Sequence, residues 1–388
     1  MRVVVAPDKF KGSLDAAGVA GALAAGVRDV LPNAECALIP MADGGDGTVD
    51  AFLATGAQPR RVRVSGPLGD PVEATYARDG ATAIVEMAAA SGLALLGRPP
   101  SRIDARRATT RGTGELLRDA LDEGARRILL GIGGSATTDG GAGALAALGA
   151  RFYDGEGDEL EPTPERLAAL TRIDLSGLAP RLRPSQQAGE PDVRIAVACD
   201  VDSPLLGPLG AAAVFGPQKG ATAGDVAYLE RVLARLAGAM SAATGRDLRD
   251  IPGAGAAGGL GWALASACGA TLERGVALVA AVRGLADALR GADWCFTAEG
   301  RIDDQTLRGK VVAGVAQLAR SANVPVVAFG GSVEGDAEIA LRPLGVTCVP
   351  ILTKPSSLEV AMHDSRANLR LAAARTVSLI APCEREHH

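Results

Sequence analysis

Short apolar strands that end in acidic, glycine-rich loops restrict the fold of this chain more than any other feature. Residues 3–6 form an apolar run that stops at Pro7-Asp8, and an Ala-rich helix is predicted from about Leu14 to Val30. Residues 36–40 form a second run, followed by an acidic glycine loop at 41–48 and a further helix. Units of strand, loop and helix build doubly wound α/β sheets, in which ligands bind at the carboxyl ends of the strands.

The length of 388 residues exceeds what one hydrophobic core usually supports and predicts two domains. After Arg61 the pattern changes to short strands typical of hairpins, at about 62–64, 72–76 and 83–87. The last third returns to alternating strands and helices. We therefore predict a discontinuous domain of residues 1–70 and 281–388, with an α/β domain of residues 71–280 inserted into it.

Composition excludes several classes of protein. With 40 basic and 45 acidic residues the formal net charge is −5, and aromatic residues make up 3%, which argues against a nucleic-acid-binding face. The N-terminal apolar run is too short for a secretory signal. The uncharged stretch from Ala254 to Leu272 is rich in Gly, so we expect a buried helix behind a glycine loop instead of a membrane span. Six Cys without a Cys-x-x-Cys pair favour reduced thiols in a cytoplasmic protein.

Lysine is rare, with five Lys among the 40 basic residues. A lysine that has not been replaced by arginine is expected where a compact, rotatable charge is needed. Four of the five lie in or beside glycine-rich loops, and we predict functional roles for Lys11, Lys219 and Lys310. Lys354 stands next to Pro355 and is interpreted as a surface residue.

Two glycine-rich segments are candidates for binding phosphate groups. The loop 131–141 follows a predicted buried strand, so its backbone N–H groups and the next helix could face an anion. Gly253 to Gly258 matches the dinucleotide string Gly-x-Gly-x-x-Gly, but no strand precedes it, and we interpret it as a packing loop. No Gly-x-x-x-x-Gly-Lys-Ser/Thr sequence occurs, which excludes a P-loop.

Carboxylates and sparse lysines recur together in these loops. Phosphoryl transfer needs this combination: cations to neutralise phosphate oxygens, carboxylates to hold Mg²⁺, and a carboxylate near the attacking hydroxyl. For Asp46 and Asp139, just ahead of predicted helices, capping is an equally good interpretation. The groups are Asp8 with Lys11, Asp43 with Asp46, Ser135 with Asp139, Asp200 and Asp202 with Lys219, and Glu299 and Asp303 with Lys310.

Eight sequence blocks stand in a fixed order along the chain: residues 6–13, 41–48, 86–93, 131–143, 198–202, 214–221, 252–261 and 299–303. Through these blocks the chain resembles the bacterial type 1 glycerate kinase family over nearly its whole length. The resemblance implies ATP-dependent phosphorylation of D-glycerate with Mg²⁺. It also implies a discontinuous flavodoxin-like domain and an inserted restriction-endonuclease-like domain, with the active site in the cleft between them.

Roles in catalysis and substrate binding are hypotheses based on charge and on position after strands. Asp200 is the candidate to orient and deprotonate the attacking hydroxyl, because it ends an apolar strand. Lys11, with Ser13, would bind the glycerate carboxylate or the transferred phosphoryl group. Asp8 is a further substrate-binding candidate, and Arg301 is the alternative carboxylate clamp, since its fork suits a bidentate pair.

The nucleotide and the metal are expected at other residues of the same set. Gly133, Gly134 and Ser135, together with Lys219, would hold the phosphates of ATP. Asp43 and Glu299 would bind Mg²⁺, directly or through water.

Other functions stay open at this point. The sequence does not distinguish phosphorylation of the 2-hydroxyl from a glycerate 3-kinase activity, although the resemblance favours the 2-hydroxyl. A nicotinamide-dependent dehydrogenase would use Gly253 to Gly258 as its fingerprint, and a two-lobed binding protein would close on a small acid without consuming ATP. We expect a small-molecule substrate, no nucleic-acid or membrane partner, and either a monomer or a homo-oligomer.

Overall fold

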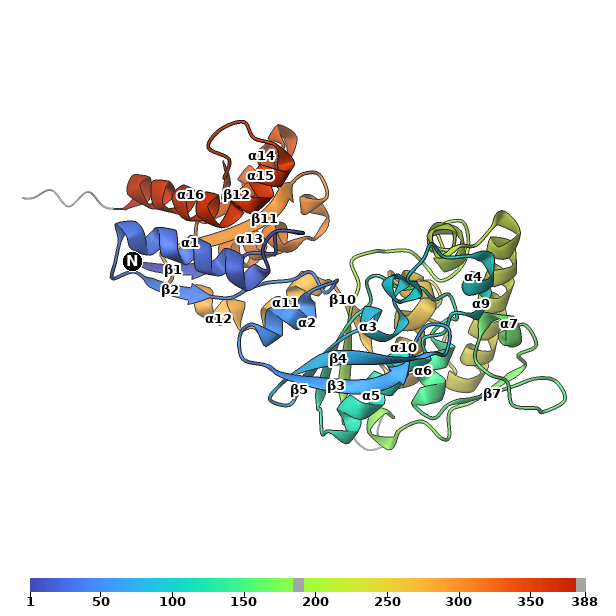
Figure 1. Cartoon of the computed structure of the whole chain (residues 1–388). Helices are drawn as coiled ribbons and strands as arrows, with labels where there is room; N and C mark the ends of the chain where they lie inside the picture. The colour runs from blue at the N-terminus through green and yellow to red at the C-terminus, as the bar shows by residue number, and fades with distance from the viewer. Residues whose placement is uncertain (184–191, 382–388) are drawn as a thin grey trace, which may run out of the picture. The chain divides into compact units, whose positions relative to one another are not determined.

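The structure consists of two compact α/β units. It is a computed structural model that describes residues 1–183 and 192–381. Unit 1 comprises Met1–Asp43 together with the chain from Val276 onward, and unit 2 comprises Gly44–Gly275. In Figure 1 the dark blue N-terminal segment and the orange to red C-terminal segments therefore share one unit, whereas the segments between them, beginning with the lighter blue α2, β3 and β4, form the other. The expectation of two α/β domains is confirmed.

The first boundary differs from the predicted position near residue 70 and lies between Asp43 and Gly44. Strand β3 (Gln58–Ser65) pairs antiparallel along its whole length with β4 (Pro71–Asp79). Because the two strands form one hairpin, a boundary at 70 would divide it, and both strands belong to unit 2. The second boundary, expected at 280, lies between Gly275 and Val276.

Unit 1 is built on a five-stranded parallel sheet. In chain order its strands are arranged 2-1-3-4-5, the order of flavodoxin-like doubly wound sheets. The order reverses between β1 and β11, and ligands bind such sheets in the crevice beyond the carboxyl ends at this reversal. The strands are β1 (Arg2–Val5), β2 (Glu35–Leu38), β11 (Trp294–Ile302), β12 (Val326–Val333) and β13 (Val346–Pro350).

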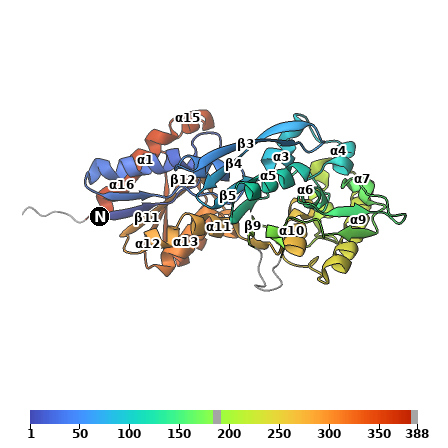
Figure 2. The same ribbon diagram turned by 90° about the horizontal axis from the view of Figure 1, so that it is seen from below.

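Helices cover both faces of this sheet. Val3 and Val5 pack into one apolar cluster with residues of α1 and α16, whereas Val4, also fully buried, points to the opposite face. Figure 2 shows α1 and α16 on one side of the sheet and α12 and α13 on the other. The helices from unit 1 are α1 (Ala16–Val30), α12 (Leu285–Leu289), α13 (Val311–Ser321), α14 (Gly335–Leu341), α15 (Leu358–His363) and α16 (Ser365–Ile380), and α11 (Gly275–Val282) begins at the boundary.

Unit 2 is built on a six-stranded mixed sheet of order β10-β9-β6-β5-β4-β3. Strands β4 and β3 pair antiparallel at one side of this sheet. The other four strands are parallel to one another: β10 (Thr271–Glu273), β9 (Arg194–Ala198), β6 (Arg127–Gly131) and β5 (Thr82–Glu86). A small second sheet pairs β7 (Arg151–Tyr153) with β8 (Arg172–Asp174). The helices are α2 (Thr48–Leu53), α3 (Ala88–Ser91), α4 (Arg102–Arg107), α5 (Arg111–Asp122), α6 (Ala142–Ala147), α7 (Pro164–Leu167), α8 (Ala211–Phe215), α9 (Ala223–Thr244) and α10 (Leu260–Cys268).

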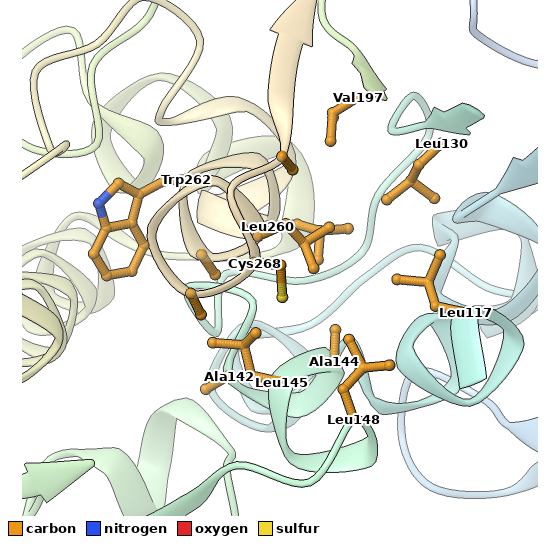
Figure 3. Close-up of a cluster of buried hydrophobic side chains, with 14 of the residues drawn as sticks. Leu117, Leu130, Ala142, Ala144, Leu145, Leu148, Val197, Leu260, Trp262 and Cys268 are labelled. Atoms are coloured by element: carbon orange, nitrogen blue, oxygen red, sulfur yellow. The ribbon is translucent and has the colours of Figure 1, made fainter. Parts of the chain in front are cut away.

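Helix α10 is the centre of the core of unit 2. All nine of its residues are buried, which confirms the buried helix expected behind a glycine loop. Figure 3 shows side chains from α6, β6 and β9 gathered around Leu260 and Cys268. Among residues 1–183 and 192–381, no helix combines the length and the apolar sequence that a membrane crossing requires. The five cysteines in the same ranges are free thiols.

Substitution of two glycines in α1 by alanine is predicted to change the stability in opposite directions. A Cβ added at Gly26 would lie 2.1 Å from the carbonyl oxygen of Arg370, because α1 and α16 approach each other closely there. A Cβ at Gly21 would meet nothing within 4 Å. We expect Gly26→Ala to lower the free energy of unfolding by about 2 kcal/mol or more. Gly21→Ala should raise it by about 0.5–1 kcal/mol, since alanine restricts the unfolded chain.

Urea unfolding followed by circular dichroism measures both variants against the unsubstituted protein. Equal effects of the two substitutions would contradict the close packing of α1 on α16 at Gly26.

Candidate functional site

Three carboxylates meet beyond the ends of β1 and β2, beside the second half of β11, in which Glu299 lies. The backbone N–H of Asp8 donates to the carbonyl of Ala298 at 2.9 Å, next to Glu299, and the N–H of Met41 donates to the carbonyl of Pro7 at 2.9 Å. Burial, together with the negative charges of Asp43 and Glu299, raises the pKa of Asp8 to about 7. The sequence-predicted Asp8, Asp43 and Glu299 are thus brought together at the reversal of strand order.

Glu299 is also held by a lysine that the sequence singled out. Its side chain is buried, with Oε1 at 3.0 Å from the Lys310 Nζ and Oε2 accepting from the Thr306 hydroxyl at 3.1 Å. Burial raises the pKa of Glu299 in spite of the ammonium. Burial alone would lower the pKa of Lys310, but the Glu299 carboxylate outweighs it and the pKa lies above its ordinary value. The pair places a positive charge beside the carboxylates.

Lys11 and Ser13 occupy the turn that follows Asp8. The turn packs against β11, since a Cβ added at Gly300 would lie 3.9 Å from the Lys11 backbone nitrogen, and Lys11 itself is exposed. The Ser13 hydroxyl donates to the carbonyl of Met362 at 2.6 Å and also hydrogen-bonds the hydroxyl of Ser365. Lys11 therefore presents a cation near the end of β11, while Ser13 ties this turn to the start of α16.

Arg301 is largely exposed at the end of the same strand. Its guanidinium forms ion pairs with Glu334 and, at 3.3 Å, with Asp303. These two acidic partners raise its pKa, Glu334 having the larger effect. A substrate carboxylate held by Arg301 would compete with both of them.

The loop after β6 presents exposed glycine backbone at the edge of the sheet of unit 2. Gly133 and Gly134 are exposed, and Gly134 has a φ of +68°, a left-handed conformation that glycine adopts without strain. The segment is pinned by two backbone hydrogen bonds of 2.9 Å, from Leu93 N–H to the Gly134 carbonyl and from Ala136 N–H to the Ser91 carbonyl. Ser135 is buried beside it. A fixed, exposed glycine backbone suits the binding of an anion.

Lys219 lies beneath this loop. Its side chain is 1% exposed, and its ammonium donates to the carbonyl of Thr137 at 2.6 Å. Burial lowers its pKa to about 7, against the opposing effect of the Asp139 carboxylate. Asp139, for which capping and catalysis were equally good interpretations, is fully buried and accepts the backbone N–H groups of Gly141 and Gly143 at the start of α6.

Asp200 follows β9, as predicted, and is exposed. Its Oδ1 accepts the backbone N–H of Gly275 at 3.0 Å, and its neighbour Asp202 pairs with the Arg274 guanidinium at 3.0 Å. The carboxyl ends of β6 and β9 are adjacent in the sheet, so Asp200 and the glycine loop lie at the same edge.

Glu86, which the sequence analysis did not single out, lies at the same edge of the sheet of unit 2. It is the last residue of β5, directly beside Gly131 in register, and its Oε1 accepts the Val49 N–H at 2.8 Å. The signal was present, because an acidic residue ends an apolar strand within one of the eight blocks. The sequence alone could not show that this strand neighbours β6.

Gly253 to Gly258 is a packing loop, as interpreted from the sequence. No strand precedes it, and a Cβ at Gly258 would lie 2.2 Å from the Thr137 carbonyl oxygen. The segment lies directly against the loop that follows β6. It therefore does not have the context of a dinucleotide-binding fingerprint.

No group of three His, Cys, Asp or Glu side chains that could hold a metal ion by itself occurs in the described ranges. Mg²⁺ in phosphoryl-transfer sites is held by one or two carboxylates, with substrate phosphates and water completing its shell. The hard oxygen donors of Asp43 and Glu299 fit that role.

The crowding of carboxylates predicts that Asp8 destabilises the folded protein above neutral pH. Its pKa is 3.8 ordinarily and about 7 in the fold, so between these values the folded state binds the proton and the unfolded state does not. Stability therefore falls as the pH rises through this window. We expect Asp8→Asn to be more stable than the unsubstituted protein by about 1–3 kcal/mol at pH 8, and by much less near pH 4.

Urea unfolding in EDTA at both pH values measures this difference. The same substitution at exposed Asp70 controls for the change of net charge. A difference between Asp8→Asn and the unsubstituted protein that does not depend on pH would contradict the raised pKa of Asp8.

Comparison with known proteins gives one consistent result. The profile of the Glycerate kinase family matches residues 3–381. A glycerate kinase of Bacillus subtilis is 47% identical over 340 residues, covering 87% of this chain and 86% of the relative. A glycerate 2-kinase of Escherichia coli is 42% identical over 385 residues, covering 98% of each chain. A crystal structure of a protein assigned as glycerate kinase 2 from Salmonella typhimurium LT2 has a TM-score of 0.84 and 42% identity, and 98% of each chain is covered.

Proposed function

Because the chain belongs to the glycerate kinase family, we propose that it transfers the terminal phosphoryl group of ATP to D-glycerate, giving 2-phosphoglycerate and ADP. The observation that carries the proposal is the match over residues 3–381, which includes both the carboxylates of unit 1 and the glycine loop of unit 2. The relative named glycerate 2-kinase favours the 2-hydroxyl as acceptor. A kinase of a small acid would work in the cytoplasm, where ATP is available.

The nucleotide phosphates would be received by the loop after β6. Gly133 and Gly134 expose backbone without side chains, and Ser135 adds a hydroxyl next to them. Backbone groups held by hydrogen bonds on Ser91 and Leu93 need no rearrangement to meet a phosphate, which favours binding.

The acidic cluster of unit 1 would handle the metal and the substrate. Asp43 and Glu299 would hold Mg²⁺, which when bound neutralises charge on the phosphate oxygens. Lys310 fixes one oxygen of Glu299 and keeps a positive charge at the site. Asp8, with a pKa of about 7, can donate a hydrogen bond to a glycerate oxygen or accept one from a glycerate hydroxyl.

Lys11 would bind the glycerate carboxylate or the transferred phosphoryl group. It is exposed in a turn that packs on the end of β11, so its ammonium can reach a ligand beyond the carboxyl ends of the strands. Ser13 would act through its tie to Met362, which holds this turn in place. Arg301 is the alternative clamp for the carboxylate.

Asp200 is the proposed base for the attacking hydroxyl. Removing a general base typically costs about 100-fold or more in turnover, whereas ground-state binding of ATP is little affected. We expect Asp200→Asn to lower kcat by at least about 100-fold and to change the KM for ATP by less than about 3-fold. Asp202→Asn is the matched control, because Asp202 pairs with Arg274 on the surface. Near-normal turnover of Asp200→Asn would exclude the base role.

The function itself is tested with purified protein, Mg-ATP and D-glycerate. ADP release that depends on glycerate, with a product that enolase alone consumes, is expected of a glycerate 2-kinase. A product that enolase consumes only after phosphoglycerate mutase is added would identify a 3-kinase. Folded protein that releases no ADP above a control without glycerate would refute the proposal.

A further inference from the structure

The loop between β6 and α6 is held from its buried side by charged side chains. Its first half is fixed through the backbone of Ser91 and Leu93. Its second half, from Ala136 to Gly141, lies outside any strand or helix, and the hydroxyls of Thr137 and Thr138 have no hydrogen-bond partner among the described residues. This second half is fixed by a hydrogen bond of 2.9 Å from the Gly140 N–H to the Gly258 carbonyl, by Asp139 within the segment, and by Lys219 from outside it.

Asp139 is the first of these fixing groups. Its carboxylate is fully buried and accepts five hydrogen bonds of 2.7–3.3 Å. The donors are the Thr109 hydroxyl, the N–H and hydroxyl of Thr110, and the backbone N–H groups of Gly141 and Gly143. A carboxylate can be buried at low cost only when it is well hydrogen-bonded. The burial of Asp139 therefore requires the five donors, and the carboxylate in turn fixes their positions. The contacts join the loop to the starts of α5 and α6.

Lys219 is the second. Its ammonium donates to the Thr137 carbonyl at 2.6 Å, two residues before Asp139, and the Asp139 charge acts on it. The lysine ends the short helix η3 (Pro217–Lys219). It is followed by Gly220, with a φ of +92°, where a Cβ would lie 2.4 Å from the Ser101 carbonyl oxygen. The turn that carries Lys219 is therefore pressed directly against the start of α4.

An ionic network around one buried carboxylate fixes that turn on its other side. Asp225, in the first turn of α9, is fully buried and forms a capping box with Thr222. It also accepts from Arg102 at 3.0 Å and from Arg106 at 2.6 Å, both on α4. Because α4 and α9 are joined in this way, the backbone of Lys219 has a defined position from which its side chain reaches the loop.

We propose that Lys219 and Asp139 are positioning residues, which hold the loop after β6 in the shape that receives phosphate groups and do not themselves touch the nucleotide. The inference rests on the proposed function of that loop. It differs from the expectation that Lys219 binds phosphate directly. A direct contact would require Lys219, which is 1% exposed, to become accessible to the nucleotide.

Hydrogen exchange of the nucleotide-free protein separates the two roles. We expect Lys219→Met to speed amide exchange in peptides spanning residues 132–143 by about 10-fold or more, because the loop loses a buried charge-assisted hydrogen bond. Calorimetry should show a dissociation constant for ADP raised about 10–100-fold. The KM for ATP should rise in parallel, while the KM for glycerate changes by less than about 3-fold. Lys354→Met, at an exposed lysine, should match the unsubstituted protein.

Two variants of Thr110 test whether Asp139 helps to hold the loop after β6 in place. Thr110→Val removes the hydroxyl that donates to Asp139 at 2.8 Å, and Thr110→Ser keeps it. Thr110→Val should show the same faster exchange and weaker ADP binding, and Thr110→Ser should restore both. Because these changes are small, the pair decides the question if Lys219→Met fails to fold, as judged by circular dichroism.

Three outcomes would overturn the inference. Weaker ADP binding with unchanged exchange in the nucleotide-free loop would show that Lys219 contacts the nucleotide. Unchanged exchange and unchanged ADP binding would show that Lys219 has no role in the loop. Equal amide exchange and equal ADP binding in Thr110→Val and Thr110→Ser would contradict a positioning role for Asp139. A failure of the proposed function is distinguishable, since it would appear as absent glycerate-dependent ADP release in the unsubstituted protein.

Discussion

All five strands of unit 1 run parallel, so all five end at one edge of the sheet. Polar residues that follow different strands must therefore share that edge, however far apart they lie in sequence. Asp8 follows the first strand and Glu299 lies near the end of the third, and these two strands are neighbours only because the order reverses between them. The reversal therefore brings the carboxylates together at the place where doubly wound sheets bind ligands.

The cluster has an energetic cost that other parts of the unit offset. Burial and repulsion by the neighbouring carboxylates raise the pKa of Asp8. Burial also raises the pKa of Glu299, because a charged carboxylate is more stable in water. Lys310 and Thr306 compensate part of this cost by bonding both oxygens of Glu299. The well-packed face formed by α1 and α16 supplies apolar burial on the same sheet. A site that is unfavourable without ligand is expected where binding of a cation or substrate provides the missing charge balance.

The sequence predicted the arrangement of the carboxylates in unit 1 better than the surroundings of the glycine loop in unit 2. Asp8 and Asp43 could be placed because each directly follows a short apolar run, and runs of this kind become parallel strands. The boundary near 70 was wrong, because a single sequence does not show which sheet the hairpin of β3 and β4 joins. Glu86 lies next to the loop after β6 because β5 pairs with β6, and this pairing is a tertiary contact that a single sequence does not show. The rarity of lysine drew attention to Lys219, but its partner Thr137 is 82 positions away, so its burial could not be foreseen.

Asp200, the proposed base, lies at the place where the chain leaves unit 2. Its carboxylate accepts the N–H of Gly275, the last residue of unit 2. Gly44, the first residue of unit 2, lies against the same place, since a Cβ there would be 2.3 Å from the Cβ of Ala198 and 3.2 Å from the Cα of Gly275. The two points at which the chain enters and leaves unit 2 are therefore side by side at the end of β9. A larger residue at position 44 would displace β9 or Gly275, to which Asp200 is hydrogen-bonded. The position of the Asp200 carboxylate therefore depends on the absence of a side chain at Gly44.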